Sequence, residues 1–213
     1  MEEILDYLGR AEGREVHRND GESDITAPYG VYRTAHPDAN VFKVIDRVVA
    51  ELGIVYDSKD WNSTVIGKIN EYIKANPVIE AEVMNAVVEF YEEYLEGAHL
   101  ELFPRECRVA MMSMYTNSPR LAWQSVQRAI LDLVAMRKTG LIRSEVSIDD
   151  GIYGKKTEGA LKHIHELVDE NYLETLMLFH MLGSYVELWS KNPDKYGKYL
   201  LGWKNRMSKL TKS

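Results

Sequence analysis

Residues 121–134 read LAWQSVQRAILDLV, and this stretch decides the fold class. Apolar side chains recur at Ala122, Val126, Ile130 and Leu133, three or four positions apart. That spacing is typical of the buried face of an α-helix. The stretch therefore predicts a long helix with one face in a hydrophobic core.

The same period extends in both directions from this helix. Further stripes are Val83, Val87, Tyr91 and Tyr94, and then Leu161, Ile164 and Val168. Alternation of the kind that marks a β-strand is not sustained anywhere, and the chain has no internal repeat or low-complexity tract. The sequence predicts a mostly α fold, with at most a small β-hairpin or loop near residues 15–33.

The first forty residues have a different pattern. The opening segment places four apolar residues on one helical face: Ile4, Leu5, Leu8 and Ala11. Gly13 is a plausible helix terminator, and the polar, Gly- and Pro-containing stretch 14–40 favours a loop. Helical periodicity resumes at Val41. We expect a short helix, a long turn-rich connection and then a second helix.

The composition and net charge of the chain argue against some classes of function. The 213 residues are 45% hydrophobic and 28% charged, as in a folded soluble protein, and the net charge is −7. Such a chain has no global basic field for nucleic acid. A single cysteine, Cys107, excludes an intrachain disulfide and suits a reducing cytoplasm. No motif calls for a cofactor.

The first thirteen residues, MEEILDYLGRAEG, carry acids where a signal peptide has a basic start. The most apolar run, Leu176 to Leu182, is shorter than the roughly 20 residues of a membrane span. We therefore expect the protein in the host cytoplasm, as a monomer. A target outside the cytoplasm would require a separate delivery agent.

Residues 191–213 contain seven Lys or Arg and one Asp, a net charge of +6. Aromatic and apolar residues such as Tyr199 and Trp203 are interleaved with the cations. One interpretation is a final helix whose cations suit the negative end of its dipole. The other is a basic patch that holds an anionic envelope surface. Both stay open.

Glu12 stands out in the N-terminal segment because it continues the apolar face of the first helix. Burial would favour its protonated form, as a general acid requires. The loop that follows supplies further candidates: Asp20, Glu22, Asp24 and Thr26. Glycoside hydrolysis needs a second carboxylate beside the acid, to activate water or to stabilise the cationic sugar. The pairing stays open between Asp20 and Asp24.

The stretch EGREVHRNDGESDITAPYGVYRTAHP resembles the N-terminal motif of glycoside hydrolase family 108, the phage endolysin and secretion-associated muramidases. Six residues carry the resemblance: Glu12, Gly13, Asp20, Thr26, Tyr29 and Gly30. Arg14 and Glu15 depart from it, because the family has a second Gly and a Tyr there. The interval from Thr26 to Tyr29 is also one residue longer.

Two later segments are similar to the peptidoglycan-binding module that usually follows this catalytic region. SVQRAI and, after an insertion, DGIYGKKTEGAL match its pattern through Gln127, Asp150, Gly151, Gly154 and Thr157. GWKNR, at residues 202–206, is similar to the closing motif of the same proteins. The resemblance predicts a lysozyme-like, two-lobed organisation, with a catalytic lobe at 1–80 and a helical wall-binding lobe at 81–213.

The resemblance implies cleavage of the β-1,4 bond between N-acetylmuramic acid and N-acetylglucosamine, with Glu12 as the acid and no metal. Asp20 or Asp24 would orient water or stabilise charge, and Thr26 would hold that water. Tyr29, Gly30 and Gln127 would contact the glycan strand of peptidoglycan. Carboxyl separation would decide between inversion and retention, and both stay open.

Delivery to the periplasmic wall would need a membrane-permeabilising partner such as a holin. Two alternatives remain. A non-catalytic wall-binding or phage structural protein is motivated by the departures at Arg14 and Glu15, because Arg14 beside Glu12 would hold that carboxylate ionised. A zinc amidase is less well supported. His163 and His165 are two residues apart on an expected helix, and no His-Glu-x-x-His motif is present.

Overall fold

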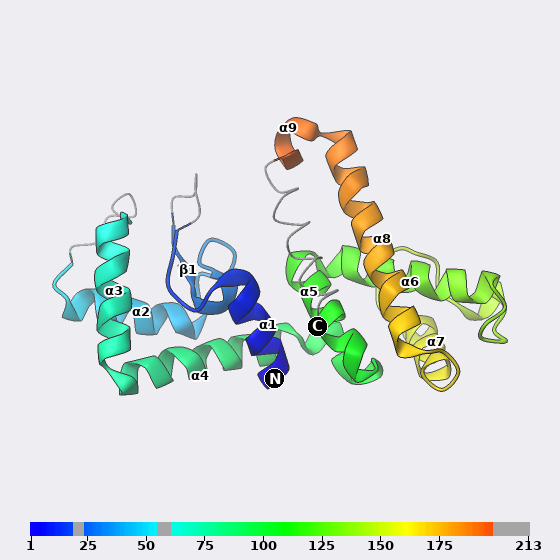
Figure 1. Ribbon diagram of the computed structural model, residues 1–213, viewed down its shortest axis with the longest axis horizontal. Coiled ribbons are helices and arrows are strands. Elements are labelled where there is room, and N and C mark those ends of the chain that lie inside the picture. The colour runs from blue at the N-terminus through cyan, green and yellow to red at the C-terminus, as the bar shows by residue number, and fades with distance from the viewer. Residues whose placement is uncertain (19–23, 55–60, 198–213) are drawn as a thin grey trace. The chain divides into compact units, whose positions relative to one another are not determined.

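The structure, a computed structural model, describes residues 1–18, 24–54 and 61–197. It confirms a mostly helical fold with one small hairpin, in which β1 (Thr26–Ala27) pairs antiparallel with β2 (Val31–Tyr32). The chain forms two compact units, Met1–Tyr94 and Leu95–Ser213 (Figure 1). The lobe boundary predicted at residue 80 falls inside a continuous helix, α4 (Pro77–Tyr94).

The first unit surrounds the hairpin with helices. Besides α4 these are α1 (Glu2–Glu12), α2 (Asn40–Glu51) and α3 (Ser63–Ala75). The helix ends follow local chemistry: Gly13 follows α1 with φ 93°, and the Asn62 side chain accepts a hydrogen bond from the Val65 N–H at the start of α3. Both match the predicted terminator and the usual N-cap residues.

Apolar periodicity decides which faces of these helices are buried. In α1 the buried side chains are Ile4, Tyr7 and Leu8. In α2 they are Val41, Phe42, Ile45, Val48 and Val49, and this helix packs on α4. The hairpin is joined by a 3₁₀ turn, η1 (Pro28–Gly30), which contacts α1.

The second unit is a helical bundle in which α6 (Pro119–Ala135) packs against α5 (Arg105–Asn117) and α8 (Glu170–Lys191). Its other elements are η2 (Glu96–Ala98), η3 (Leu100–Leu102), η4 (Arg143–Glu145), α7 (Lys155–His165) and α9 (Pro193–Tyr196). Ser118 caps α6 and Pro119 begins it. The four stripe positions that predicted this helix are all buried.

Cys107 lies in α5 with its thiol buried. Burial raises the pKa of this thiol to about 12. Within residues 1–18, 24–54 and 61–197, no helix is long and apolar enough to cross a membrane.

Candidate active site

Glu12 is the last residue of α1, and its side chain lies against the backbone of Gly30. A Cβ atom built on Gly30 would come within 2.7 Å of the Glu12 Cγ. Gly30 also has φ +86°, a conformation that L side chains rarely adopt. One carboxylate oxygen of Glu12, Oε1, is buried. The structure thus brings together two residues that the sequence placed in one site.

Tyr29 is held in place from two sides. Its backbone N–H donates a hydrogen bond to the Gly13 carbonyl at 2.8 Å, which ties the turn to the end of α1. Its own carbonyl accepts a hydrogen bond from the Tyr91 hydroxyl of α4 at 2.6 Å. Tyr29 itself has φ 64°, and its side chain is buried, with 7% exposed. The turn that positions Gly30 opposite Glu12 is therefore fixed by both neighbouring helices.

Thr26 lies on β1, where its backbone pairs with two segments. It exchanges hydrogen bonds with His17, at 3.0 and 2.8 Å, and is in register with Tyr32 of β2. The residue is completely buried. Its hydroxyl oxygen has no hydrogen-bond partner among the residues that the structure describes. Because a buried hydroxyl usually has a partner, Thr26 is a position at which a bound water or ligand would be stabilised.

The second carboxylate is only partly located. Asp20 lies outside the described residues. Asp24 is half-buried, and its carboxylate accepts a hydrogen bond from the Ile25 N–H at 2.8 Å, as in a local turn. The choice between the two acids stays a prediction.

The two residues that depart from the family motif have partners of their own. The Arg14 guanidinium pairs with Asp6 of α1 at 3.2 Å. Glu15 pairs with Lys74 of α3 at 2.5 Å, and this hydrogen bond raises the pKa of Lys74. Both pairs are exposed, so each is expected to contribute little to stability. Arg14 and Glu15 tie the segment after α1 to its helical neighbours.

A groove of about 620 Å³ lies beside this segment in the first unit. Its lining comes from residues 15–18 and from the start of α3, including His17, Trp61, Asn62 and Asn70. Asn70 joins two parts of this lining, because its side chain accepts from the Val16 N–H and donates to the Val16 carbonyl, both at 2.9 Å. Because Trp61 is only 2% exposed, the accessible lining is mainly polar and charged, as suits a polar ligand.

Gln127 lies in the second unit, and its position is internal. It is 1% exposed, and its amide nitrogen donates to Asp150 Oδ1 at 3.0 Å and to the Ile152 carbonyl at 2.9 Å. Its amide oxygen accepts a hydrogen bond from the Gly151 N–H at 2.8 Å. Thr157 Oγ1 lies 3.4 Å from the amide nitrogen. The Gln127 side chain therefore organises the Asp-Gly-x-x-Gly loop from within.

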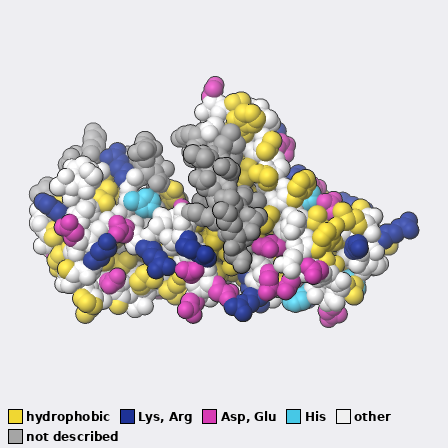
Figure 2. Space-filling model, in the orientation of Figure 1, with side chains coloured by type: hydrophobic (Ala, Val, Ile, Leu, Met, Phe, Trp, Pro, Cys, Tyr) yellow, Lys and Arg dark blue, Asp and Glu magenta, His cyan; other side chains and the backbone are white. Residues whose placement is uncertain are grey.

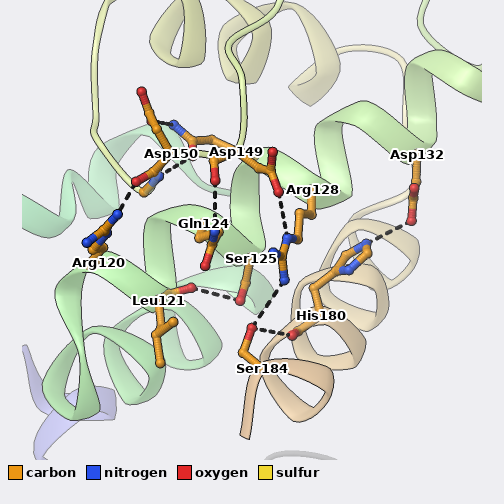
Figure 3. A network of polar contacts seen from close by, with 12 residues as sticks. Arg120, Leu121, Gln124, Ser125, Arg128, Asp132, Asp149, Asp150, His180 and Ser184 are labelled. Carbon is orange, nitrogen blue, oxygen red and sulfur yellow. Dashed lines mark hydrogen bonds and ion pairs between the residues drawn. The ribbon is translucent and has the colours of Figure 1, made fainter. Parts of the chain in front are cut away.

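Figure 3 shows that this loop is also held from α6. Gln124 donates to the Asp149 carbonyl at 2.8 Å, and Arg128 forms an ion pair with the Asp149 carboxylate at 2.8 Å. The hydrogen bond from Arg128 lowers the pKa of Asp149. Gly151 has φ +76°, and a Cβ there would lie 2.5 Å from the Arg120 carbonyl oxygen. The pattern that resembles a wall-binding module is thus one connected cluster.

The same view contains a Ser, a His and an Asp that do not form a hydrolytic triad. His180 Nε2 lies 2.8 Å from Asp132 Oδ2, but the Ser184 hydroxyl donates to the His180 backbone carbonyl at 3.0 Å (Figure 3). The Ser184 hydroxyl proton is therefore directed away from the His180 imidazole. Among the described residues, no group of three or more His, Cys, Asp or Glu is arranged to hold a metal ion.

Sequence reasoning missed the residues that position the site. Tyr91 was predicted as part of a core stripe, and no sequence pattern connects its hydroxyl to Tyr29. The groove residues His17 and Trp61 were also not singled out, because their proximity depends on long-range hydrogen bonds between residues 16–18 and residues 61–70.

No protein-family model, no curated protein and no solved structure matches this chain. The resemblance to glycoside hydrolase family 108 therefore depends on the motif residues quoted above.

Proposed function

We propose that the protein is a muramidase that hydrolyses the glycan strands of peptidoglycan, with Glu12 as its general acid. The observation that carries the proposal is the close approach of Glu12 to Gly30, where a carboxyl at a helix end faces backbone with no room for another side chain. Such packing restricts the Glu12 side chain to one place, as a general acid requires.

In this proposal Glu12 donates its proton to the oxygen of the leaving sugar. Asp20 or Asp24 stabilises the developing positive charge or activates water, and the buried hydroxyl of Thr26 holds that water. Tyr29 and Gly30 line the sugar site. The groove of about 620 Å³ has room for a saccharide unit, and it is lined by residues that begin three positions after Glu12, not by Glu12 itself.

The test is mass spectrometry of purified peptidoglycan after digestion by the wild type and by Glu12→Gln. We expect the wild type to release fragments with reducing N-acetylmuramic acid ends, and Glu12→Gln to be slower by roughly 10²–10⁴-fold, as for loss of a general acid. Glu2→Gln is the matched control, because Glu2 is an exposed acid on the same helix. Wild-type activity in the Glu12→Gln variant, with the fold intact by circular dichroism, would refute the role of Glu12.

A second candidate is a wall-binding protein without catalysis. It is favoured by the ordered Gln127–Asp150–Gly151 cluster, together with the departures at Arg14 and Glu15. Sedimentation with purified sacculi, without release of reducing ends by the wild type, would support this candidate over the muramidase.

A further inference from the structure

A second cleft of the first unit lies between the turn that precedes α2 and the last turns of α4. Its volume is about 500 Å³, and its lining comes from residues 35–39 on one side and from Phe90, Glu93 and Tyr94 on the other. A smaller cavity of about 90 Å³ continues it toward Glu89. We call the two together the α4 cleft. Its lining contains none of the residues assigned to hydrolysis, so the cleft is a separate candidate site.

Three aromatic rings form one wall of the α4 cleft. The Phe90 and Tyr94 rings are stacked, with centroids 5.5 Å apart and planes 13° apart. The His36 ring meets Phe90 at 4.8 Å and Tyr94 at 5.4 Å, both in edge-to-face geometry. The turn that carries His36 is held by a hydrogen bond of 2.9 Å from the His36 N–H to the Tyr32 carbonyl. Because the wall is already formed, binding a ligand there has a small ordering cost.

The charged groups of the cleft lining are all acids. Asp38 and Glu93 line its main part and Glu89 lines its smaller part, whereas the described lining contains no Lys or Arg. Asp38 and Glu93 have no hydrogen-bond or ion-pair partner among the residues that the structure describes. Burial lowers the pKa of His36, so its ring is neutral at pH 7 and adds no compensating charge.

Several other acids of the first unit have a cationic partner. Figure 2 shows Lys and Arg side chains among the Asp and Glu of this unit. Asp46 pairs with Arg33, and Glu15 pairs with Lys74, each at 2.5 Å. The α4 cleft is therefore a concave surface on which carboxylates and aromatic rings occur together, without a cation supplied by the described chain.

We propose that the α4 cleft binds an organic cation, a guanidinium or ammonium group carried by a small molecule or by a peptide side chain. The faces of the Phe90 and Tyr94 rings attract such a cation, because an aromatic face carries negative electrostatic potential. Asp38 and Glu93 accept hydrogen bonds from its N–H groups. A metal ion is a poorer fit, since no group of three or more His, Cys, Asp or Glu in the described chain is arranged to hold one.

The test is an NMR titration of the isotope-labelled full chain with n-butylguanidinium and with its neutral analogue n-butylurea. We expect saturable shift changes at residues 35–39 and 89–94 with the cation. The neutral analogue should bind at least roughly tenfold more weakly, because it lacks the charge that the rings and carboxylates recognise. No saturable change at these residues, or equal binding of the two compounds, would overturn the proposal. The result does not depend on the activity assigned to Glu12.

Variants of the lining test which groups hold the cation. Asp38→Asn/Glu93→Gln changes two exposed acids and should weaken n-butylguanidinium binding by roughly tenfold. Phe90→Leu keeps an apolar side chain but removes the ring face, at an expected loss of roughly fivefold. Glu92→Gln is the matched control, since Glu92 is an exposed acid of α4 outside the lining. Wild-type affinity in the double variant, with the fold intact by circular dichroism, would refute the role of the carboxylates.

A second probe distinguishes the two sources of the cation. A blocked peptide with one arginine between glycines carries the same guanidinium group on a peptide backbone. Tighter binding of this peptide than of n-butylguanidinium would support a peptide ligand, and equal or weaker binding would support a small molecule. Binding of the peptide with its arginine replaced by citrulline, which is neutral, at an equal affinity would contradict recognition of a cation.

Discussion

At the scale of single residues, the candidate site depends on a contact between a carboxyl side chain and a residue that has none. Glu12 and Gly30 were assigned to one site from motif spacing, and the structure places them in contact. The physical reason is local: Gly13 ends α1, and the N–H of Tyr29, the residue before Gly30, donates a hydrogen bond to the Gly13 carbonyl. Short-range signals of this kind are readable in a sequence.

Gly30→Ala tests this contact. The new methyl group would collide with Glu12 in a backbone conformation that alanine resists, so we expect a loss of about 2 kcal/mol in the free energy of unfolding. If Glu12 is the general acid, as proposed, Gly30→Ala would also lower activity, because the Glu12 side chain must move away from the new methyl group. Urea unfolding and the rate of sacculus digestion measure the two effects.

Gly67→Ala is the control for the stability effect of Gly30→Ala alone, because Gly67 also lines the groove proposed for the saccharide. Gly67 lies inside α3, where none of the described residues comes within 4 Å of an added Cβ. This substitution is expected to raise stability by up to about 1 kcal/mol through helix propensity. Equal changes in the free energy of unfolding for Gly30→Ala and Gly67→Ala would mean that Glu12 does not pack tightly against Gly30.

The residues that could not be predicted are those whose role depends on long-range packing. Thr26 was chosen from spacing, but its pairing with His17 depends on how the chain returns after the loop. His17 and Trp61 come together in the groove because Asn70 of α3 pairs with Val16 and Arg18 donates to the Trp61 carbonyl. No local pattern records such contacts.

At the scale of elements, α5 and α8 meet with acids at the first turn of each helix. A hydrogen bond with Glu106 of α5 raises the pKa of Glu170 of α8, and burial followed by the Glu106 charge raises the pKa of Glu174. A carboxyl with a raised pKa in the folded state contributes stability that is present at low pH and is lost as the pH rises through that value. The helix pair is therefore less stable at pH 7 than in mild acid.

Glu106→Gln should relieve this repulsion. We expect a rise in Tm at pH 7 of about 1–2 °C, and a smaller difference from wild type near pH 4, where the acids are protonated in both proteins. Differential scanning calorimetry across this pH range measures it. Glu92→Gln, an exposed change on α4, controls for net charge. A Tm difference that grows as the pH falls would contradict the assignment.

A second prediction at the scale of elements concerns the loop at residues 149–154. Gln127→Ala would leave the buried Gly151 N–H without its acceptor, at an expected cost of about 2–3 kcal/mol. Proteolysis in the loop should accelerate in parallel. Gln124→Ala removes one bond from a half-buried residue and should cost less than about 1 kcal/mol. Similar protease rates for the two variants would show that Gln127 is not the centre of the cluster.

Helices were the most predictable elements. The stripe at Ala122, Val126, Ile130 and Leu133 predicted α6, and all four side chains are buried. The exposed apolar side chains of α8, such as Phe179 and Val186, were not recognised, because apolar residues on a helix indicate burial without showing which of them remain exposed. That distinction depends on the tertiary contacts of α5 and α6.

At the scale of the whole molecule, charge is unevenly distributed along the chain. Residues 191–213 carry +6 while the complete chain carries −7. We expect that replacing Lys204, Arg206, Lys209 and Lys212 with Gln weakens sedimentation with purified sacculi, and that added salt does the same to the wild type. These four positions lie outside the described residues.

Hydrolysis of soluble glycan fragments by this charge variant should remain at the wild-type rate. Equal losses on sacculi and on soluble fragments would mean that the cations act through folding. The comparison separates attraction to an anionic envelope from the alternative of a final helix whose cations suit its dipole.

The position of the boundary between the two units could not be predicted from the apolar periodicity of the sequence. A boundary at residue 80 was expected, but α4 continues through Tyr94 before the chain enters the second unit. The whole of α4 belongs to the first unit, and its apolar stripe does not show that the unit ends where the helix ends.

The Tyr91 hydroxyl bonds the Tyr29 carbonyl across 62 positions of sequence. A recombinant fragment truncated at residue 80 would lose this tether and, with it, one of the two anchors of the turn that faces Glu12. A shortened version of the protein made to test the proposed activity should therefore retain the chain through Tyr94.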